Sequence, residues 1–291
     1  MTREAALQVE APEAAHRAVI QERRHALIFP REHGAWGILL IPLATGAGVA
    51  LLRGGRPFPV VLFLLVALVL FWMQTPAESW FGAGPMRAQS KEELRLVQRV
   101  TFLLAGSALI LLATLFWRGS NPKLLILGGV AAIAFLGQAL LKKGGRKTRV
   151  LAQVVGAIGL TCTAPGAFYV STTQFGPTAY GLWLANWIFV AGQVLYVQTR
   201  IRGARVQGFM SRCEHGATFL EGHVAAIGLL VLAIRLGWLP LAAVLAFVPA
   251  LARGTAWFFG KPETLSVHRL GWMEMVQALI FAVILVSALC F

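Results

Sequence analysis

Two short glutamate–histidine elements are the most chemically informative part of this sequence. The tetrapeptide EHGA occurs twice, at residues 32–35 and 214–217. Imidazole and carboxylate groups bind divalent metals, and histidine also transfers protons near neutral pH. The two pairs would form a metal or proton site if they met in one pocket. Alternatively, both elements simply begin helices, since glutamate stabilises the positive end of a helix. The metal-ligand candidates, and with them the one cofactor candidate, a divalent metal, are Glu32, His33, Glu214, His215 and His223.

The second element leads into an apolar run that contains further ionisable residues. Glu214 and Glu221 are seven residues apart and therefore share one helix face, and His223 follows two residues later. Ionisable residues at membrane depth usually face the interior of a helix bundle. Glu274 either pairs with a nearby basic residue or joins Glu221 and His223 in one network. The candidates for catalytic groups are His33, Glu78, His215 and Glu221.

A third group of polar residues suits an anionic or polar ligand. Gln74 and Glu78 share a face if the helix continues through Pro76. Clustered cations, as in the basic segment 142–149, bind phosphates and anionic headgroups, although they also simply retain a loop on one side of a membrane. The ligand-binding candidates are Lys142, Lys143, Arg146, Arg200, Arg202, Gln74 and Trp36.

The elements that position these residues are membrane-spanning helices. Hydrophobic residues make up 57% of the 291 residues and charged residues 13%, with a mean hydropathy of +0.70. A helix that crosses a bilayer needs about 20 apolar residues. The sequence therefore predicts an all-α transmembrane bundle of nine helices. The predicted spans are 35–52, 58–73, 100–117, 124–141, 150–170, 178–197, 216–234, 236–252 and 270–290.

The distribution of Lys and Arg predicts the orientation of this bundle. Of the 26 Lys and Arg residues, 21 fall on alternate connections, counting the N-terminal tail as the first. Basic loops stay in the cytoplasm, so we expect a cytoplasmic N-terminus and an external C-terminus. All 12 acids are Glu, and they fall on the same side as the six His. We expect residues 1–29 to form a flexible cytoplasmic tail and residues 30–291 a single nine-helix domain.

The net charge of +14 does not indicate a nucleic-acid partner. The basic residues lie close to the span ends, where each contributes about 1 kcal/mol of attraction to anionic lipids. We therefore expect membrane lipids as partners and a multi-pass location in the bacterial cytoplasmic membrane.

Two segments resemble a known family. The motif FPREHGAWG at residues 29–37, the segment RLGWMEMVQA at residues 269–278 and the nine spans resemble the YwiC-like family of bacterial membrane proteins. The resemblance covers the chain from about residue 28 onward. It implies a bacterial integral membrane protein and no particular activity.

The wider layout resembles the UbiA superfamily of intramembrane prenyltransferases. That resemblance implies nine helices, a cytoplasmic N-terminus and a cytoplasmic-side pocket for a prenyl diphosphate. The superfamily has aspartate-rich magnesium motifs after its second and sixth helices. Here these regions read QTPAESW at residues 74–80 and YVQTRIRGAR at residues 196–205. Because magnesium prefers carboxylate and phosphate oxygens, the absence of aspartate argues against magnesium–aspartate catalysis.

Three functions remain open from the sequence. The leading hypothesis is a protein that binds an isoprenoid-type or anionic lipid, or a quinone, in a cytoplasmic-side pocket between the first, second, sixth and seventh spans. The second is a prenyl- or lipid-modifying transferase, a UbiA-like enzyme with an atypical active site. The third is an accessory subunit of a respiratory or photosynthetic membrane complex, with membrane proteins as partners. A transporter is disfavoured, because the outer halves of the spans contain almost no charge.

Overall fold

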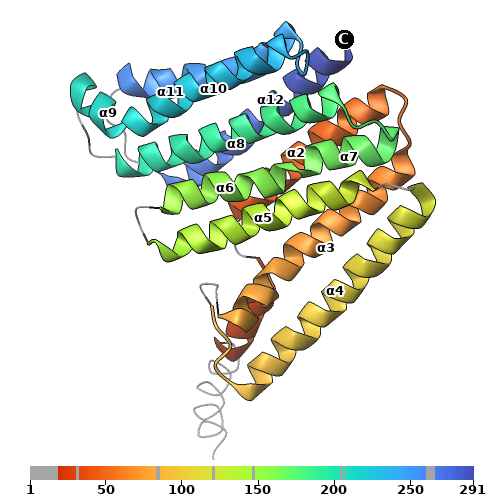
Figure 1. The fold of residues 1–291 in the computed structure, drawn as a ribbon. Coiled ribbons are helices and arrows are strands. Elements are labelled where there is room, and N and C mark those ends of the chain that lie inside the picture. The colour runs from red at the N-terminus through yellow and green to blue at the C-terminus, as the bar shows by residue number, and fades with distance from the viewer. Residues whose placement is uncertain are drawn as a thin grey trace, which may run out of the picture. The chain divides into compact units, whose positions relative to one another are not determined.

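The computed structural model describes residues 19–30, 33–82, 86–119, 122–145, 148–203, 206, 208–259 and 266–291, without the side chains of residues 33–35, 118 and 267. The described residues form helices joined by turns (Figure 1), as expected of apolar segments whose backbone must satisfy its own hydrogen bonds in lipid. Residues 19–28 form a first helical segment. The later helices are α2 (His33–Leu52), α3 (Pro57–Phe81), α4 (Lys91–Gly119), α5 (Lys123–Lys143), α6 (Arg149–Thr161), α7 (Thr163–Thr172), α8 (Pro177–Arg202), α9 (Phe209–His215), α10 (Ala217–Arg235), the 3₁₀ helix η1 (Leu241–Phe247), α11 (Val248–Phe259) and α12 (Val267–Cys290).

Within the described ranges, eight helical segments are long and apolar enough to cross a membrane. They correspond to eight of the nine predicted spans, so the prediction of a multi-pass helical membrane protein is confirmed. The remaining predicted span, 35–52, coincides with α2, whose fully described part, Trp36–Leu52, is a shorter apolar helix. The count of nine spans and the orientation of the termini stay predictions.

Two predicted spans have a different internal structure. The span predicted at 150–170 consists of α6 and α7, which meet at Cys162. The span predicted at 236–252 is wrong in its bounds, because η1 begins only at Leu241 and α11 continues to Phe259. A turn causes this shift: Gly237 adopts a left-handed φ of 70°, and Pro240 enters η1 in an extended conformation. Arg253, expected in a connection, therefore lies inside α11.

The chain folds as two compact units, one from Met1–His33 and Leu65–Thr114 and the other from Gly34–Leu64 and Leu115–Phe291. The division of the sequence at residue 30 stays a prediction, and residues 1–18 of the expected tail lie outside the described part.

In the first unit, the helical segment at residues 19–28 contacts α3 and α4. Arg23 Nε lies 2.7 Å from Glu93 Oε1, and the hydrogen bond with this carboxylate raises the pKa of Arg23. Arg24 Nη2 lies 2.8 Å from Glu92 Oε2. The Trp72 indole donates to the Ile28 carbonyl oxygen over 2.8 Å. Two ion pairs and the hydrogen bond of one half-buried indole thus attach this segment to the rest of the unit.

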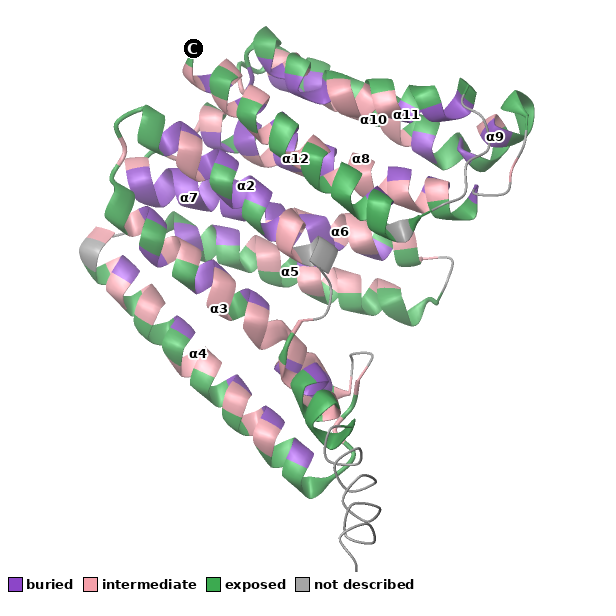
Figure 2. Cartoon of the chain, turned by 180° about the vertical axis from the view of Figure 1, so that it is seen from behind, coloured by how far each residue is buried: buried purple, intermediate pink, exposed green. Residues whose placement is uncertain are grey.

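In the second unit, α5, α6, α8 and α10 pack in sequence as a row, and α12 packs against η1 and α11 (Figure 1). Figure 2 shows the most continuous burial along α7. Helix α2 approaches α7 closely, since a Cβ on Gly46 would collide with the Ala164 carbonyl. It also binds α8 through fully buried polar side chains, because Asn186 Nδ2 donates to Thr45 Oγ1 over 2.9 Å. These contacts hold α8 firmly, and α8 contributes most of the candidate site.

Candidate functional site

An ion pair between α11 and α12 is the centre of the candidate site. Arg253 Nη1 lies 2.6 Å from Glu274 Oε1, and Arg253 Nη2 donates to Glu274 Oε2 over 3.0 Å. Only 12% of the Arg253 side chain and 18% of the Glu274 side chain are exposed. The sequence offered an ion pair as one of two interpretations of Glu274, and this interpretation is confirmed.

Local sequence explains why these two helices present their charges at this level. Helix α12 begins after Ser266, whose hydroxyl accepts a hydrogen bond from the Arg269 N–H as a helix cap. Glu274 lies seven residues after the start of α12, about 10 Å along the helix at 1.5 Å per residue. Arg253 lies six residues before the end of α11, about 9 Å from that end. The pair is therefore well inside both spans.

Helix α8 adds three polar side chains from one of its faces. Gln193 Oε1 accepts a hydrogen bond from Arg253 Nη2 over 2.9 Å. The guanidinium carbon of Arg253 lies 4.2 Å from the centre of the Tyr196 ring, a cation–π contact. Arg200 follows four residues after Tyr196 and places a second positive charge near Glu274. Spacings of three and four residues put all three side chains on one helix face.

Several buried polar atoms of this cluster have no hydrogen-bond partner among the described residues. Three of them are donors, namely Gln193 Nε2, Arg200 Nε and Arg253 Nε. Buried polar groups are normally hydrogen-bonded. The cluster therefore has donor capacity that its own residues do not use.

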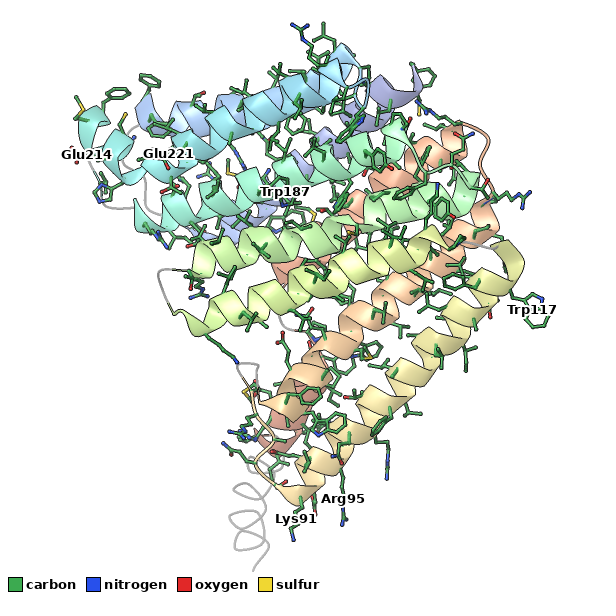
Figure 3. All side chains as sticks on the ribbon, viewed as in Figure 1. Lys91, Arg95, Trp117, Trp187, Glu214 and Glu221 are labelled. Atoms are coloured by element: carbon green, nitrogen blue, oxygen red, sulfur yellow. The ribbon has the colours of Figure 1, made fainter. Side chains whose placement is uncertain are left out.

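An apolar cavity of about 210 Å³ adjoins the cluster. Residues of α6, α8, α10, η1 and α11 line it, and its polar lining comes from Gln193, Tyr196, His223 and Arg253. Trp187 lies at the α6 side, where its indole donates to the Val154 carbonyl over 3.1 Å (Figure 3). At Gly192, another lining residue, a Cβ would meet no atom within 4 Å. The cavity thus keeps open space directly beside the backbone of α8.

The residues of the second EHGA element lie at the α9–α10 end of the unit (Figure 3). Glu214 and His215 are exposed, and His215 Nδ1 contacts the Ser211 carbonyl oxygen at 2.9 Å. Glu221 is exposed and forms no hydrogen bond or ion pair with any described residue. His223 is half-buried, contacts the Phe219 carbonyl oxygen at 2.9 Å and lines the cavity. Of this group, the structure brings only His223 to the cavity.

A metal site at the Glu-His elements stays a prediction. Over the described ranges, no group of three His, Cys, Asp or Glu lies close enough together to hold a metal ion. Glu32 and the side chain of His33 lie outside the described part, so the meeting of the two elements is untested.

The predicted ligand-binding residues lie in several places. Lys142 and Lys143 are exposed in the last turn of α5, and Arg202 is exposed in the last turn of α8, whereas Arg200 is half-buried. Trp36 is half-buried near the start of α2. Arg146 lies outside the described residues.

Gln74 and Glu78 belong to the first unit. Helix α3 continues through Pro76, and Gln74 Nε2 donates to Glu78 Oε1 over 3.0 Å. The predicted shared face is confirmed. This hydrogen bond joins two residues of the same helix, and the ligand-binding role of Gln74 stays a prediction.

Sequence reasoning missed Arg253, Gln193 and Tyr196. Arg253 directly follows the predicted span 236–252 and was therefore expected in a connection. A usable signal exists in the spacing Gln193, Tyr196 and Arg200, which places three polar or amphipathic side chains on one face of an otherwise apolar span. Such a face is typical of a helix that contacts polar groups inside a bundle.

The fold and this site define an integral, multi-pass helical membrane protein with a buried charged cluster beside an apolar cavity. Residues 29–169 match the family described as YwiC-like protein. The chain is also similar to Uncharacterized protein YwiC of Bacillus subtilis (strain 168), with 24% identity over 260 residues that cover 89% of this chain and 96% of that protein. The resemblance to the YwiC-like family predicted from the motif at residues 29–37 is confirmed over residues 29–169, as is a multi-pass location in the bacterial membrane. No solved structure matches the chain, and the UbiA-like layout stays a prediction.

Proposed function

We propose that this protein binds a membrane lipid, either an isoprenoid-type or anionic lipid or a quinone, with its apolar part in the cavity between α8, α10 and α11. The observation that supports this proposal is the position of the cavity. Its walls are apolar along most of their surface, and Gln193, Tyr196 and Arg253 form a polar edge. Binding sites for small molecules commonly combine apolar walls with a few polar groups that orient the ligand.

The cavity volume limits how much of a ligand enters. An apolar cavity of about 150 Å³ is enough for a benzene-sized molecule, whereas drug-sized ligands occupy roughly 300–1,000 Å³. A cavity of about 210 Å³ therefore accommodates one ring or one branched end of a chain. The rest of a lipid would lie along the helix surfaces.

The predicted orientation makes this a site in the cytoplasmic half of the membrane. Gln193 lies nine residues before the end of α8 at Arg202, about 13 Å along the helix. With a cytoplasmic N-terminus, that end of α8 faces the cytoplasm. Lys142, Lys143 and Arg202 are then at the membrane surface, where each would attract anionic headgroups by about 1 kcal/mol.

Filling the cavity tests this proposal. Gly192→Leu introduces a side chain into open space that the cavity occupies, so it should block the ligand without a backbone collision. Gly228→Leu is the matched control, because Gly228 lies in α10, is exposed, faces open space and does not line the cavity.

The measurement compares the lipids that co-purify with the wild type and both variants in a mild detergent, by solvent extraction and mass spectrometry. We expect one lipid class that is retained by the wild type and Gly228→Leu and lost from Gly192→Leu, with equal thermal stability of all three. An identical lipid content in the three proteins would refute the proposal.

A further inference from the structure

The charges of the buried cluster do not balance. Arg200 and Arg253 contribute two positive charges, and Glu274 contributes one negative charge. Arg253 pairs with Glu274, whereas Arg200, which is half-buried in the last turn of α8 with its Nε inaccessible to solvent, forms no ion pair with any described residue. Charges inside a protein are normally paired, since an unpaired charge in a medium of low dielectric constant is costly. Counting only residues that the structure describes, the cluster is therefore one negative charge short of neutrality.

The hydrogen-bond donors without partners indicate which chemical group would supply the missing negative charge. Gln193 Nε2, Arg200 Nε and Arg253 Nε are all buried and without partners in the described structure. A phosphate or a carboxylate offers several acceptor oxygens together with negative charge, and guanidinium groups bind both with charge-assisted hydrogen bonds. A quinone carbonyl accepts hydrogen bonds but leaves the positive charge unbalanced. The cluster therefore suits an anion better than a quinone.

The cavity gives the anion an apolar partner on the same molecule. Gln193 and Arg253 belong both to the cluster and to the cavity lining. We infer that Gln193, Arg200 and Arg253 bind the phosphate or carboxylate head of a single-chain amphiphile whose apolar end enters the cavity. Glu274 is the resident counterion, which holds Arg253 in place when the ligand is absent. This inference rests on the proposed function and narrows its ligand to an anionic amphiphile.

The role of Glu274 as counterion has a measurable consequence. Its carboxylate repels an incoming anion while it occupies one side of Arg253. Glu274→Gln removes this charge but keeps the size of the side chain and an oxygen that accepts from Arg253. We therefore expect the variant to bind an anionic amphiphile about tenfold more tightly, or about 1.4 kcal/mol.

The experiment uses the full-length protein in nanodiscs and three probes. Decyl phosphate has both the chain and the charge, 1-decanol has the chain alone, and inorganic phosphate has the charge alone. Binding is measured by titration calorimetry against empty nanodiscs. Glu92→Gln is the matched control, because it removes the same charge from an exposed ion pair in the first unit.

We expect Glu274→Gln to bind decyl phosphate about tenfold more tightly and 1-decanol with unchanged affinity. Glu92→Gln should change the affinity for neither probe. Arg253→Gln should bind decyl phosphate about tenfold more weakly than the wild type. The double variant Arg253→Gln/Glu274→Gln should not show the tighter binding of decyl phosphate that Glu274→Gln shows. Because the double variant leaves neither charge of the ion pair unpaired, it still provides a test if Arg253→Gln alone does not fold.

Each contrary outcome refutes either the anionic head site, the apolar cavity as a binding site, or both. If inorganic phosphate binds as tightly as decyl phosphate, the inference of an amphiphilic ligand is refuted and the cluster is a site for free phosphate. If Gly192→Leu abolishes binding of both chain-bearing probes while Glu274→Gln leaves decyl phosphate unchanged, the anionic head site is refuted and the cavity proposal stands. If Gly192→Leu affects neither probe, both proposals fail.

Discussion

Replacing Glu274 with leucine should destabilise this protein by about 3–5 kcal/mol, because it leaves the Arg253 guanidinium buried without its counterion. The size follows from burial, since more than four-fifths of each side chain is inaccessible. Arg253→Met should cost a similar amount for the converse reason. Replacing both residues removes the unpaired charge, so the double variant should lie within about 1–2 kcal/mol of the wild type.

The assay is a double-mutant cycle on purified protein in detergent, followed by circular dichroism during heating. At about 2–4 °C per kcal/mol for a chain of this order of size, each single variant should melt about 6–20 °C below the wild type. The double variant should melt close to it. If each single variant melts within about 2 °C of the wild type, or the double variant loses the sum of both, the pair is not the buried, coupled interaction described.

Three further predictions concern the fold. Asn186→Leu should cost about 0.6–2 kcal/mol, the range found for hydrogen bonds between membrane helices. The cost should largely disappear when Thr45→Val is already present, and chemical unfolding in detergent measures both. Gly46→Val should abolish or strongly reduce folded protein in gel filtration, because its side chain collides with the Ala164 carbonyl, whereas Gly128→Val at an exposed, open position of α5 should purify normally. A reporter enzyme that is active only outside the cytoplasm should be active when fused to the C-terminus and inactive when fused to the N-terminus, and the reverse result would refute the predicted orientation.

Much of the fold could be predicted because apolar run length alone decides whether a helix can cross a bilayer. Eight expected spans appear as helices for this reason. The expected bounds of the span at 236–252 were wrong because the apolar run continues unbroken through the turn at Gly237 and Pro240. Hydropathy cannot register a turn made of apolar residues, and the left-handed conformation of Gly237 is a local backbone property.

The candidate site was predicted only in part, because its geometry depends on which helices lie side by side. Glu274 was recognised as a residue that needs a partner, but one sequence does not show that α11 and α12 are neighbours. Arg253 and Gln193 are 60 residues apart and meet only in the folded unit. The EHGA repeat is a strong pattern in the sequence, yet its second copy lies on an exposed end of the unit and only the nearby His223 reaches the cavity.

The length of α2 has a consequence for the surrounding membrane. This helix runs from His33 to Leu52, 20 residues, and covers about 30 Å at 1.5 Å per residue. A typical hydrocarbon core is also about 30 Å thick, so a transmembrane α2 matches this thickness only when it stands nearly upright and has no spare length for tilt. Leu51 and Leu52 are exposed at its end and are available for contact with the lipid chains. A mismatch costs a fraction of a kcal/mol per ångström, so a thicker bilayer must thin beside α2, and acyl chain length becomes a variable that sets where in a membrane, and next to which lipids, this protein resides.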